Sequence, residues 1–320
     1  TYKDFKIIIL SYLALFAISF ILYPKELLLA FIHTKPSSVL GLVRYDPLVY
    51  IPLLALLCFT IFTFRKTRSF KVSNSIISIS IWIFFSILSS VLLSTIFAGA
   101  DPGNVADWSN TFMSADLKLF GTYPGFWLHQ HLPSSFLEKL IVYTYIYLPA
   151  IISLWTVFLI VYKNGIFYKD FIHKMFLAFI VCFPLWILLP SICPGQMYIG
   201  NILKQPAPSP VSEVLVKGPP SVFAGKNINL LIKKWTDPTE KQLAISTFPS
   251  MHSTWGIIFA YSVATVLFAI RNKYKWAILT TVAICVAILN MFGAIYLLQH
   301  YAIDLLAGIV IGILVQKIKR

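Results

Sequence analysis

Residues 248–304 read FPSMHSTWGIIFAYSVATVLFAIRNKYKWAILTTVAICVAILNMFGAIYLLQHYAID, and each of their two histidines stands at the start of an apolar run. Between His252 and His300 the chain has room for two membrane-spanning helices of about 20 residues each. A chain that crosses a membrane twice returns to the side it left, so both histidines are predicted at one membrane face. Ionisable residues are costly in such apolar sequence, and a pair at one depth therefore indicates chemistry.

The composition is that of a membrane protein. Hydrophobic residues make up 58% of the 320 residues and charged residues 12%, about half the charged fraction of soluble domains. The net charge of +14 would fit a nucleic-acid binder, but Lys and Arg lie at the ends of apolar segments, as membrane topology requires. We therefore expect no nucleic-acid partner. The four cysteines have neither metal-like spacing nor the setting of a disulfide framework.

Hydropathy predicts an all-α polytopic membrane protein with about eight transmembrane helices. The predicted spans are residues 5–23, 47–64, 76–98, 138–162, 171–192, 253–270, 276–298 and 300–317. A tight turn near Leu298–His300 must separate the last two. Two connections are longer than plain turns. Residues 99–137 mix aromatic and polar side chains, which suits a membrane interface, and the proline-rich and lysine-rich residues 193–248 are expected to form a lid over the site.

Charge predicts the orientation of the chain. With eight spans, the termini and the even-numbered loops share one side, and fifteen Lys and Arg residues but only two acids fall there. Positive residues in short loops mark the cytoplasmic side. We expect cytoplasmic termini, and His252, His300 and both long loops on the periplasmic, extracellular or lumenal side.

His300 and Asp304 lie four residues apart at the start of a predicted helix, so their side chains can meet. A carboxylate that accepts from one imidazole nitrogen leaves the other nitrogen free to act as a nucleophile or base. Pro249 is expected to be the first residue of the preceding helix. The amides of Ser250, Met251 and His252 would then form an anion site at the positive end of the helix dipole. Alone, each pattern is equally well an ordinary helix start.

Together, these two stretches resemble the second and third signature motifs of the type-2 phosphatidic acid phosphatase superfamily, whose membrane members cleave or transfer lipid phosphate groups. The resemblance implies a six-helix catalytic core, here residues 76–320, with residues 1–75 as two additional N-terminal helices. It implies His300 as a nucleophile that forms a phosphohistidine, Asp304 as its orienting carboxylate and His252 as the general acid. Ser250 and Met251 would bind the substrate phosphate.

The sequence departs from the phosphatase branch of that family. Gly293 and Ala294 stand where that branch has Ser-Arg, and its first motif is absent. The element His-Tyr-x-x-Asp, at residues 300–304, and the stretch LFGTYPGFWL at residues 119–128 look more like the inositol phosphorylceramide synthase and sphingomyelin synthase branch. Lysines of the long loop could replace the missing cations, namely Lys217, Lys226, Lys233, Lys234 and Lys241; of these, Lys226, Lys233 and Lys234 are our candidates for phosphate binding.

The leading hypothesis is a metal-independent and cofactor-independent membrane enzyme that moves a phosphoryl-containing headgroup from a phospholipid to a lipid alcohol. Carboxylates are too few and too scattered to predict a metal site. One alternative is a phosphatase that hydrolyses phosphatidic acid or a polyprenyl (pyro)phosphate. Another, from a different class, is an inactive lipid-binding or transport protein. The sequence names neither the lipid donor and acceptor nor the oligomeric state.

Overall fold

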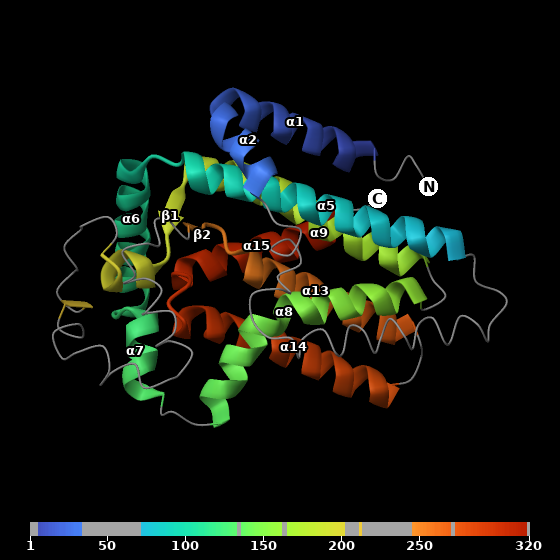
Figure 1. Cartoon of the computed structure of the whole chain (residues 1–320). Coiled ribbons are helices and arrows are strands. Elements are labelled where there is room, and N and C mark those ends of the chain that lie inside the picture. Colours follow the sequence, from blue (N-terminus) through green and yellow to red (C-terminus); the bar gives the residue numbers. More distant parts are fainter. Residues whose placement is uncertain are drawn as a thin grey trace. The chain divides into compact units, whose positions relative to one another are not determined.

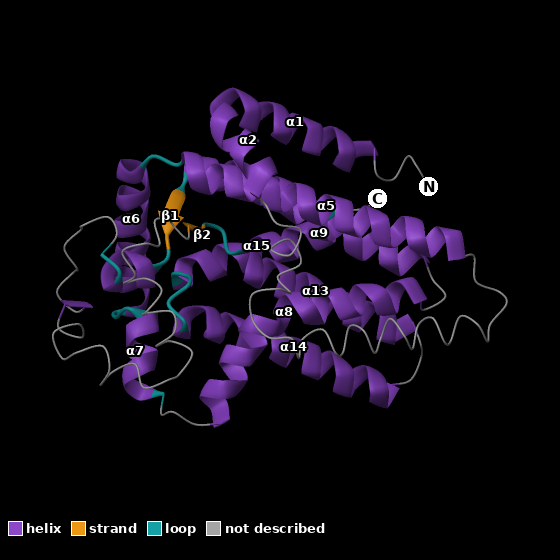
Figure 2. Ribbon diagram, viewed as in Figure 1, coloured by secondary structure: helices purple, strands orange, loops and turns teal. Residues whose placement is uncertain are grey.

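The computed structural model describes residues 6–33, 72–132, 136–161, 165–201, 211–212, 245–269 and 273–318, and most of them are helical (Figures 1 and 2). The α-helices are α1 (Lys6–Leu22), α2 (Pro24–His33), α5 (Val72–Gly99), α6 (Pro102–Phe120), α7 (Pro124–His131), α8 (Phe136–Val161), α9 (Gly165–Leu188), α13 (Met251–Ala269), α14 (Lys273–Tyr296) and α15 (Ala302–Lys317). A π-helical turn, η3, spans Gly195–Ile199.

Helices occupy seven of the eight segments predicted as membrane spans, and the remaining one, residues 47–64, lies outside the described residues. Within the described part, three helices are long and apolar enough to cross a membrane: Phe136–Ile160, Phe167–Leu188 and Ala277–Tyr296. The bent pair Ile8–Leu22 and Pro24–Ala30 would make a fourth if it counts as one span. The apolar helices indicate an integral membrane protein, and the total of eight spans stays a prediction.

Two helix boundaries differ from those that we predicted. The span predicted at residues 171–192 ends at Leu188, because residues Pro190–Ile192 form strand β1. This strand pairs antiparallel with β2 (Ile245–Thr247), with Ser191 opposite Ser246. The helix predicted to begin at Pro249 begins instead at Met251. The two strands therefore hold the beginning and the end of the long 193–248 connection next to each other.

The chain divides into two compact units. The first comprises the described residues of 1–95 and 147–177, and the second those of 96–146 and 178–319. In the first unit, the Tyr12 ring of α1 makes edge-on contacts with Phe85 of α5 and Phe176 of α9. A hydrogen bond of 2.6 Å also joins the Tyr12 and Ser89 hydroxyls. We predicted a boundary between residues 75 and 76, which differs from this division into two units, and that boundary stays a prediction.

The second unit contains both histidine motifs, and α13 is its central helix, packed against α14 and α15. The approach of α15 depends on Gly308, where a Cβ atom would collide with the Ser250 carbonyl and the Ser253 hydroxyl. At Gly256, α13 lies against the backbone of Ala287 in α14. The opposite faces of α14 and α15 expose large apolar side chains, as lipid contact requires, namely Ile278, Leu279, Val282, Ile284, Ile288, Phe292, Leu306, Val310, Ile313 and Leu314.

Residues 99–137, for which we expected an interfacial segment, fold largely into α6 and α7. Asp101 caps α6 by accepting the Asn104 amide at 3.0 Å, and Gly121 ends the helix in the left-handed conformation. One face of α6 is buried, and Asp116 lies on that face among apolar residues. α6 contacts both β1 and the start of α15, which brings this segment to the histidine motifs.

Candidate active site

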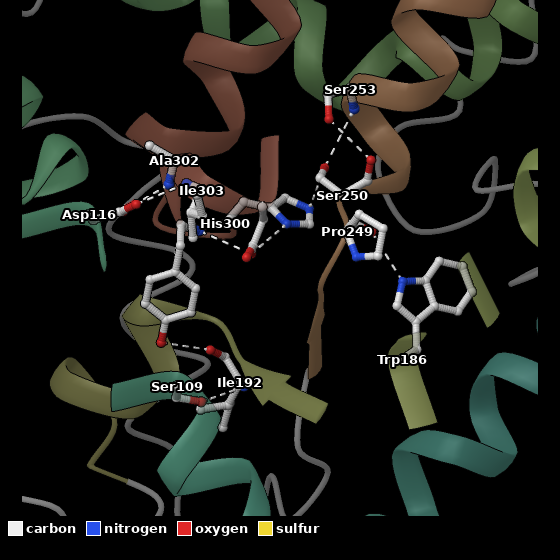
Figure 3. Close-up of polar contacts among 12 residues, drawn as sticks. Ser109, Asp116, Trp186, Ile192, Pro249, Ser250, Ser253, His300, Ala302 and Ile303 are labelled. Atoms are coloured by element: carbon white, nitrogen blue, oxygen red, sulfur yellow. Dashed lines mark hydrogen bonds and ion pairs between the residues drawn. The ribbon is translucent and has the colours of Figure 1, made fainter. Parts of the chain in front are cut away.

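The structure brings the two histidine motifs together at the start of α15. The amide of Ser250 donates to the carbonyl oxygen of Asp304 at 3.0 Å. The Ser250 hydroxyl lies 3.4 Å from Nε2 of His300, and Nδ1 of His300 lies 3.4 Å from Oδ2 of Asp304 (Figure 3). These contacts place a serine on one side of the imidazole and a carboxylate on the other.

The His300 ring has one preferred tautomer in this arrangement. Asp304 is fully buried, and a carboxylate only accepts hydrogen bonds, so Nδ1 of His300 carries the proton that faces it. Nε2 is then the unprotonated nitrogen and can accept from the Ser250 hydroxyl. Burial lowers the pKa of His300 from its ordinary 6.5 to about 3. The free protein therefore holds His300 neutral near pH 7, with a lone pair on Nε2.

His252, in the first turn of α13, lies beside His300. The centroids of the two rings are 6.0 Å apart, and the ring planes meet at 61°. The His252 ring also stacks on Tyr145 of α8, with 4.3 Å between centroids. Nδ1 of His252 is buried and has no hydrogen-bond partner in the described part of the chain. The stacking fixes the plane of the ring, while that nitrogen stays available to a ligand.

The turn between α14 and α15 sets the position of His300. α14 ends at Tyr296 and α15 begins at Ala302, so the predicted break near Leu298–His300 is confirmed. Leu298 has a positive φ of 51°, and the amides of Gln299 and His300 fold back onto the carbonyl oxygen of Ala294. The Leu298 carbonyl in turn accepts the amide of Gly195, the first residue of η3.

The start of α13 differs in detail from the predicted anion site. Ser250 caps the helix, because its carbonyl accepts from the Thr254 amide and its own amide is used by Asp304. The indole of Trp186 donates to the carbonyl of Pro249 at 3.1 Å. The amides of Met251 and His252 have no hydrogen-bond partner among the described residues. Two of the three predicted amides thus remain available at the positive end of the α13 dipole.

Asp116 is the main residue that we did not assign a role from the sequence. Its carboxylate, 3% exposed, accepts from the amides of Ala302 at 2.8 Å and Ile303 at 2.9 Å (Figure 3). These are the first two amides of α15. Burial raises the pKa of Asp116 to about 6, and the nearby charge of Asp304 adds to this effect. A signal was present: Asp116 lies on the apolar face of its helix, at spacings of three and four residues from Met113 and Phe112.

Tyr301 connects the start of α15 to β1 by a hydrogen bond. Its ring is 1% exposed, and its hydroxyl donates to the Ile192 carbonyl at 3.0 Å. The amide of Ile192 in turn donates to the Ser109 hydroxyl of α6 at 2.9 Å. The backbone amide of Tyr301 donates to Oδ2 of Asp304 at 3.2 Å, which satisfies one amide at the start of the helix.

Gly293 and Ala294, which stand where the phosphatase branch has Ser-Arg, are packed so closely that they leave no room for larger side chains. A Cβ atom on Gly293 would collide with the Ile141 carbonyl and would lie 2.7 Å from the Cβ of Tyr145. Ala294 is fully buried, and its carbonyl accepts the two amides of the turn. The absence of larger side chains here is therefore part of how α8 and α14 pack in this chain.

Two histidines of α7 and the predicted loop lysines remain to be placed. His129 is buried in α7, where its Nε2 donates to the Tyr296 carbonyl at the end of α14 and its ring lies against the Tyr296 ring. His131 is exposed and stacks on Trp127. The loop lysines lie outside the described residues, namely Lys217, Lys226, Lys233, Lys234 and Lys241. Within the described residues, no three His, Cys, Asp or Glu side chains are grouped as a metal site.

Comparison with known proteins supports the resemblance stated above. The PAP2 superfamily is the family whose model matches this chain, over residues 226–318. That match contains both histidine motifs and the three helices α13, α14 and α15. No curated protein and no solved structure matches the chain. The match supports an enzyme of the phosphatase and phosphotransferase type. It covers the part of the chain in which His252 and His300 lie side by side.

Proposed function

We propose that this protein is a membrane lipid phosphotransferase, which moves a phosphoryl-containing headgroup from a phospholipid donor to a lipid alcohol through a phosphohistidine. The observation that carries this proposal is the placement of His300 between Asp304 and Ser250, with His252 beside it. A neutral imidazole with one nitrogen held by a carboxylate is an activated nucleophile. The match to the PAP2 superfamily adds support for this chemistry.

In the first step, Nε2 of His300 attacks phosphorus and forms the N–P bond while the P–O bond to the donor's diacylglycerol breaks. Burial lowers the pKa of His252 to about 3 in the free protein, so His252 gains its proton in the substrate complex and gives it to the departing alkoxide oxygen. The negative charge of the substrate phosphate favours protonation of an adjacent imidazole. The cationic His300 that results is stabilised by Asp304, which lies 3.4 Å from Nδ1.

In the second step, the hydroxyl oxygen of a lipid alcohol attacks phosphorus and the N–P bond breaks, which returns His300 to its neutral form. His252 accepts the proton of that hydroxyl and is ready for the next cycle. The amides of Met251 and His252, together with the Ser250 hydroxyl, are placed to hold the phosphoryl oxygens in both steps.

Transfer from a phosphodiester is favoured over hydrolysis of a phosphomonoester by the charges at the site. Asp116 and Asp304 are both buried there, and the positions of the missing Ser-Arg pair are closed. A diester carries one negative charge, whereas a monoester carries close to two near neutral pH and needs more cations. The alternative, a lipid phosphate phosphatase, depends on whether the loop lysines supply these cations.

The experiment is an incubation of the purified full chain with labelled phosphatidylinositol, phosphatidic acid or a polyprenyl phosphate, each with and without ceramide or diacylglycerol. We expect labelled headgroup on the added alcohol and an acid-labile phosphohistidine that His300→Ala lacks. Free phosphate as the sole product would support the phosphatase instead. If the protein forms neither a phosphohistidine nor a product with any donor, the result would support the third hypothesis, an inactive lipid-binding or transport protein.

A further inference from the structure

Asp116 holds the N-terminus of α15 from outside that helix. It comes from α6, and its two oxygens accept from the amides of Ala302 and Ile303 (Figure 3). The first amides of a helix have no partner within the helix, and a Ser, Thr or Asn near the end commonly satisfies them. Here a buried carboxylate does so across 186 positions of sequence. Burying a charged side chain costs free energy of folding unless the charge is well hydrogen-bonded, so a buried carboxylate at position 116 is energetically costly.

The helix turn that Asp116 holds is the one that orients the catalytic pair. Ala302 and Ile303 stand between His300 and Asp304, and the Asp304 side chain accepts from Tyr301 as well as facing the His300 ring. A rotation of this turn would move Asp304 relative to His300. Among the described residues, no cation is paired with Asp116, and its contacts are the two amides. Its charge is therefore directed at the helix start.

Occupancy of these amides also affects where an anion can bind. Two helices begin next to the histidines in the chain: α13 at Met251, one residue before His252, and α15 at Ala302, two residues after His300. Both have the positive dipole end that attracts phosphate. At α15 the amides are taken by Asp116, whereas at α13 the amides of Met251 and His252 have no partner in the described structure. A substrate phosphate is thus directed to α13, next to His252 and to Nε2 of His300.

Resting on the proposed function, we propose that Asp116 is a positioning residue with two effects. It fixes the first turn of α15 so that Asp304 aligns the His300 ring, and it excludes the substrate phosphate from the α15 amides. The second effect distinguishes this role from a structural one. Without Asp116, phosphate would gain a competing, unproductive anion site, so binding would become tighter while turnover became slower.

The test uses Asp116→Ala and the isosteric Asp116→Asn in the full chain, purified in detergent. Asp107→Asn is the matched control, because Asp107 is exposed on the same helix and loses the same charge. We measure kcat and KM in the reaction that the wild type performs. We also measure the inhibition by inorganic phosphate and the rise in melting temperature that inorganic phosphate produces. In Asp116→Ala we expect kcat to fall by at least about tenfold, with tighter phosphate binding. Both changes should be smaller in Asp116→Asn, whose side-chain oxygen still accepts from one amide, and absent in the control.

Two results would overturn the proposal. One is wild-type kcat in Asp116→Ala. The other is a fall in kcat that follows a lower melting temperature in both variants, without tighter phosphate binding, which would make Asp116 a structural cap only. Failure of the proposed function looks different, because the wild type would then either release free phosphate as its sole product or have no turnover at all. The phosphate-induced rise in melting temperature needs no turnover, and it tests the exclusion of anions by Asp116 in that case too.

Discussion

The backbone of Ser250 is hydrogen-bonded to the backbone of Asp304: the Ser250 amide donates to the Asp304 carbonyl oxygen at 3.0 Å. This bond joins the residue that caps α13 to the first turn of α15. It fixes the two motifs relative to each other independently of any side chain in the proposed chemistry. Substitution of a catalytic side chain should therefore remove activity without separating the two helices, and the first two predictions depend on this.

The first prediction concerns the two histidines. His300→Ala and His252→Ala should each lower turnover by at least about 10², as loss of a nucleophile or a general acid does. His252→Ala should retain more activity on a donor whose leaving alcohol is acidic, such as a nitrophenyl phosphodiester, because that alkoxide departs without a proton. Turnover on natural and nitrophenyl donors, together with melting curves, checks this. Wild-type turnover in either variant would show that its histidine has another role.

The second prediction concerns the His300–Asp304 pair. Asp304→Asn keeps a side chain of the same size but loses the carboxylate that faces Nδ1 of His300. Activity should fall steeply, and the double variant Asp304→Asn/His300→Ala should be hardly slower than His300→Ala alone, because the two residues act as one unit. Single and double variants are compared in one assay. Additive losses would mean that Asp304 acts independently of His300.

The third prediction concerns the protonation state of His300. Burial lowers its pKa to about 3, so the ring should stay neutral, with the proton on Nδ1, throughout pH 5–8. ¹⁵N NMR of histidine-labelled protein measures this, and the signals lost in His300→Gln identify the residue. A titration midpoint near 6.5 would show instead that the ring is solvated like an ordinary histidine.

The fourth prediction concerns the closed positions on α14. Gly293→Ala should destabilise the protein by about 1–3 kcal/mol, the usual cost of overpacking, because its Cβ would collide with the Ile141 carbonyl. Gly256→Ala is the matched control, since its Cβ would meet Ala287 at an ordinary 3.4 Å. Thermal unfolding in one detergent compares the two. Equal stability of both variants would show that α8 can move away from α14.

Hydropathy and spacing predicted much of this arrangement. Apolar runs of span length located seven helices, and a double crossing was enough to expect His252 and His300 at one face. Sequence could not assign Asp116 its place, because its partners are backbone amides 186 positions away. It also could not show that the Ser250 amide is used by Asp304, since that depends on how closely Gly308 lets α15 approach α13. Local patterns predict elements, whereas these contacts arise from packing between elements.

The fifth prediction concerns topology. The excess of Lys and Arg on the side of the termini predicts that residues 193–248 face away from the cytoplasm. In a background without native cysteines, a cysteine at position 68 should react with a membrane-impermeant maleimide added from the cytoplasmic side of sealed membrane vesicles, whereas one at position 217 should react only after the vesicles are permeabilised. Reaction of position 217 but not of position 68 from the cytoplasmic side would reverse the predicted orientation.

The last prediction concerns the charge of the substrate. Asp304 faces His300, and Asp116, whose pKa is about 6, adds negative charge near it as pH rises. Packing closes the positions that hold Ser-Arg in the phosphatase branch. The second ionisation of a phosphomonoester has a pKa of about 6, so above that pH it gains a charge that a diester lacks. Catalytic efficiency on phosphatidic acid should therefore fall relative to that on phosphatidylinositol as pH rises from 5 to 8.

Kinetics with both lipids in mixed micelles, at constant ionic strength, measure this ratio. Replacing Lys226, Lys233 and Lys234 together by glutamine separates the two explanations of how phosphate is held. If these lysines form the missing clamp, their loss should impair the monoester more than the diester, because a second charge gains more from added cations. Higher efficiency on phosphatidic acid than on any diester at pH 8, abolished in the lysine variant, would contradict our preference for transfer and make the protein a phosphatase.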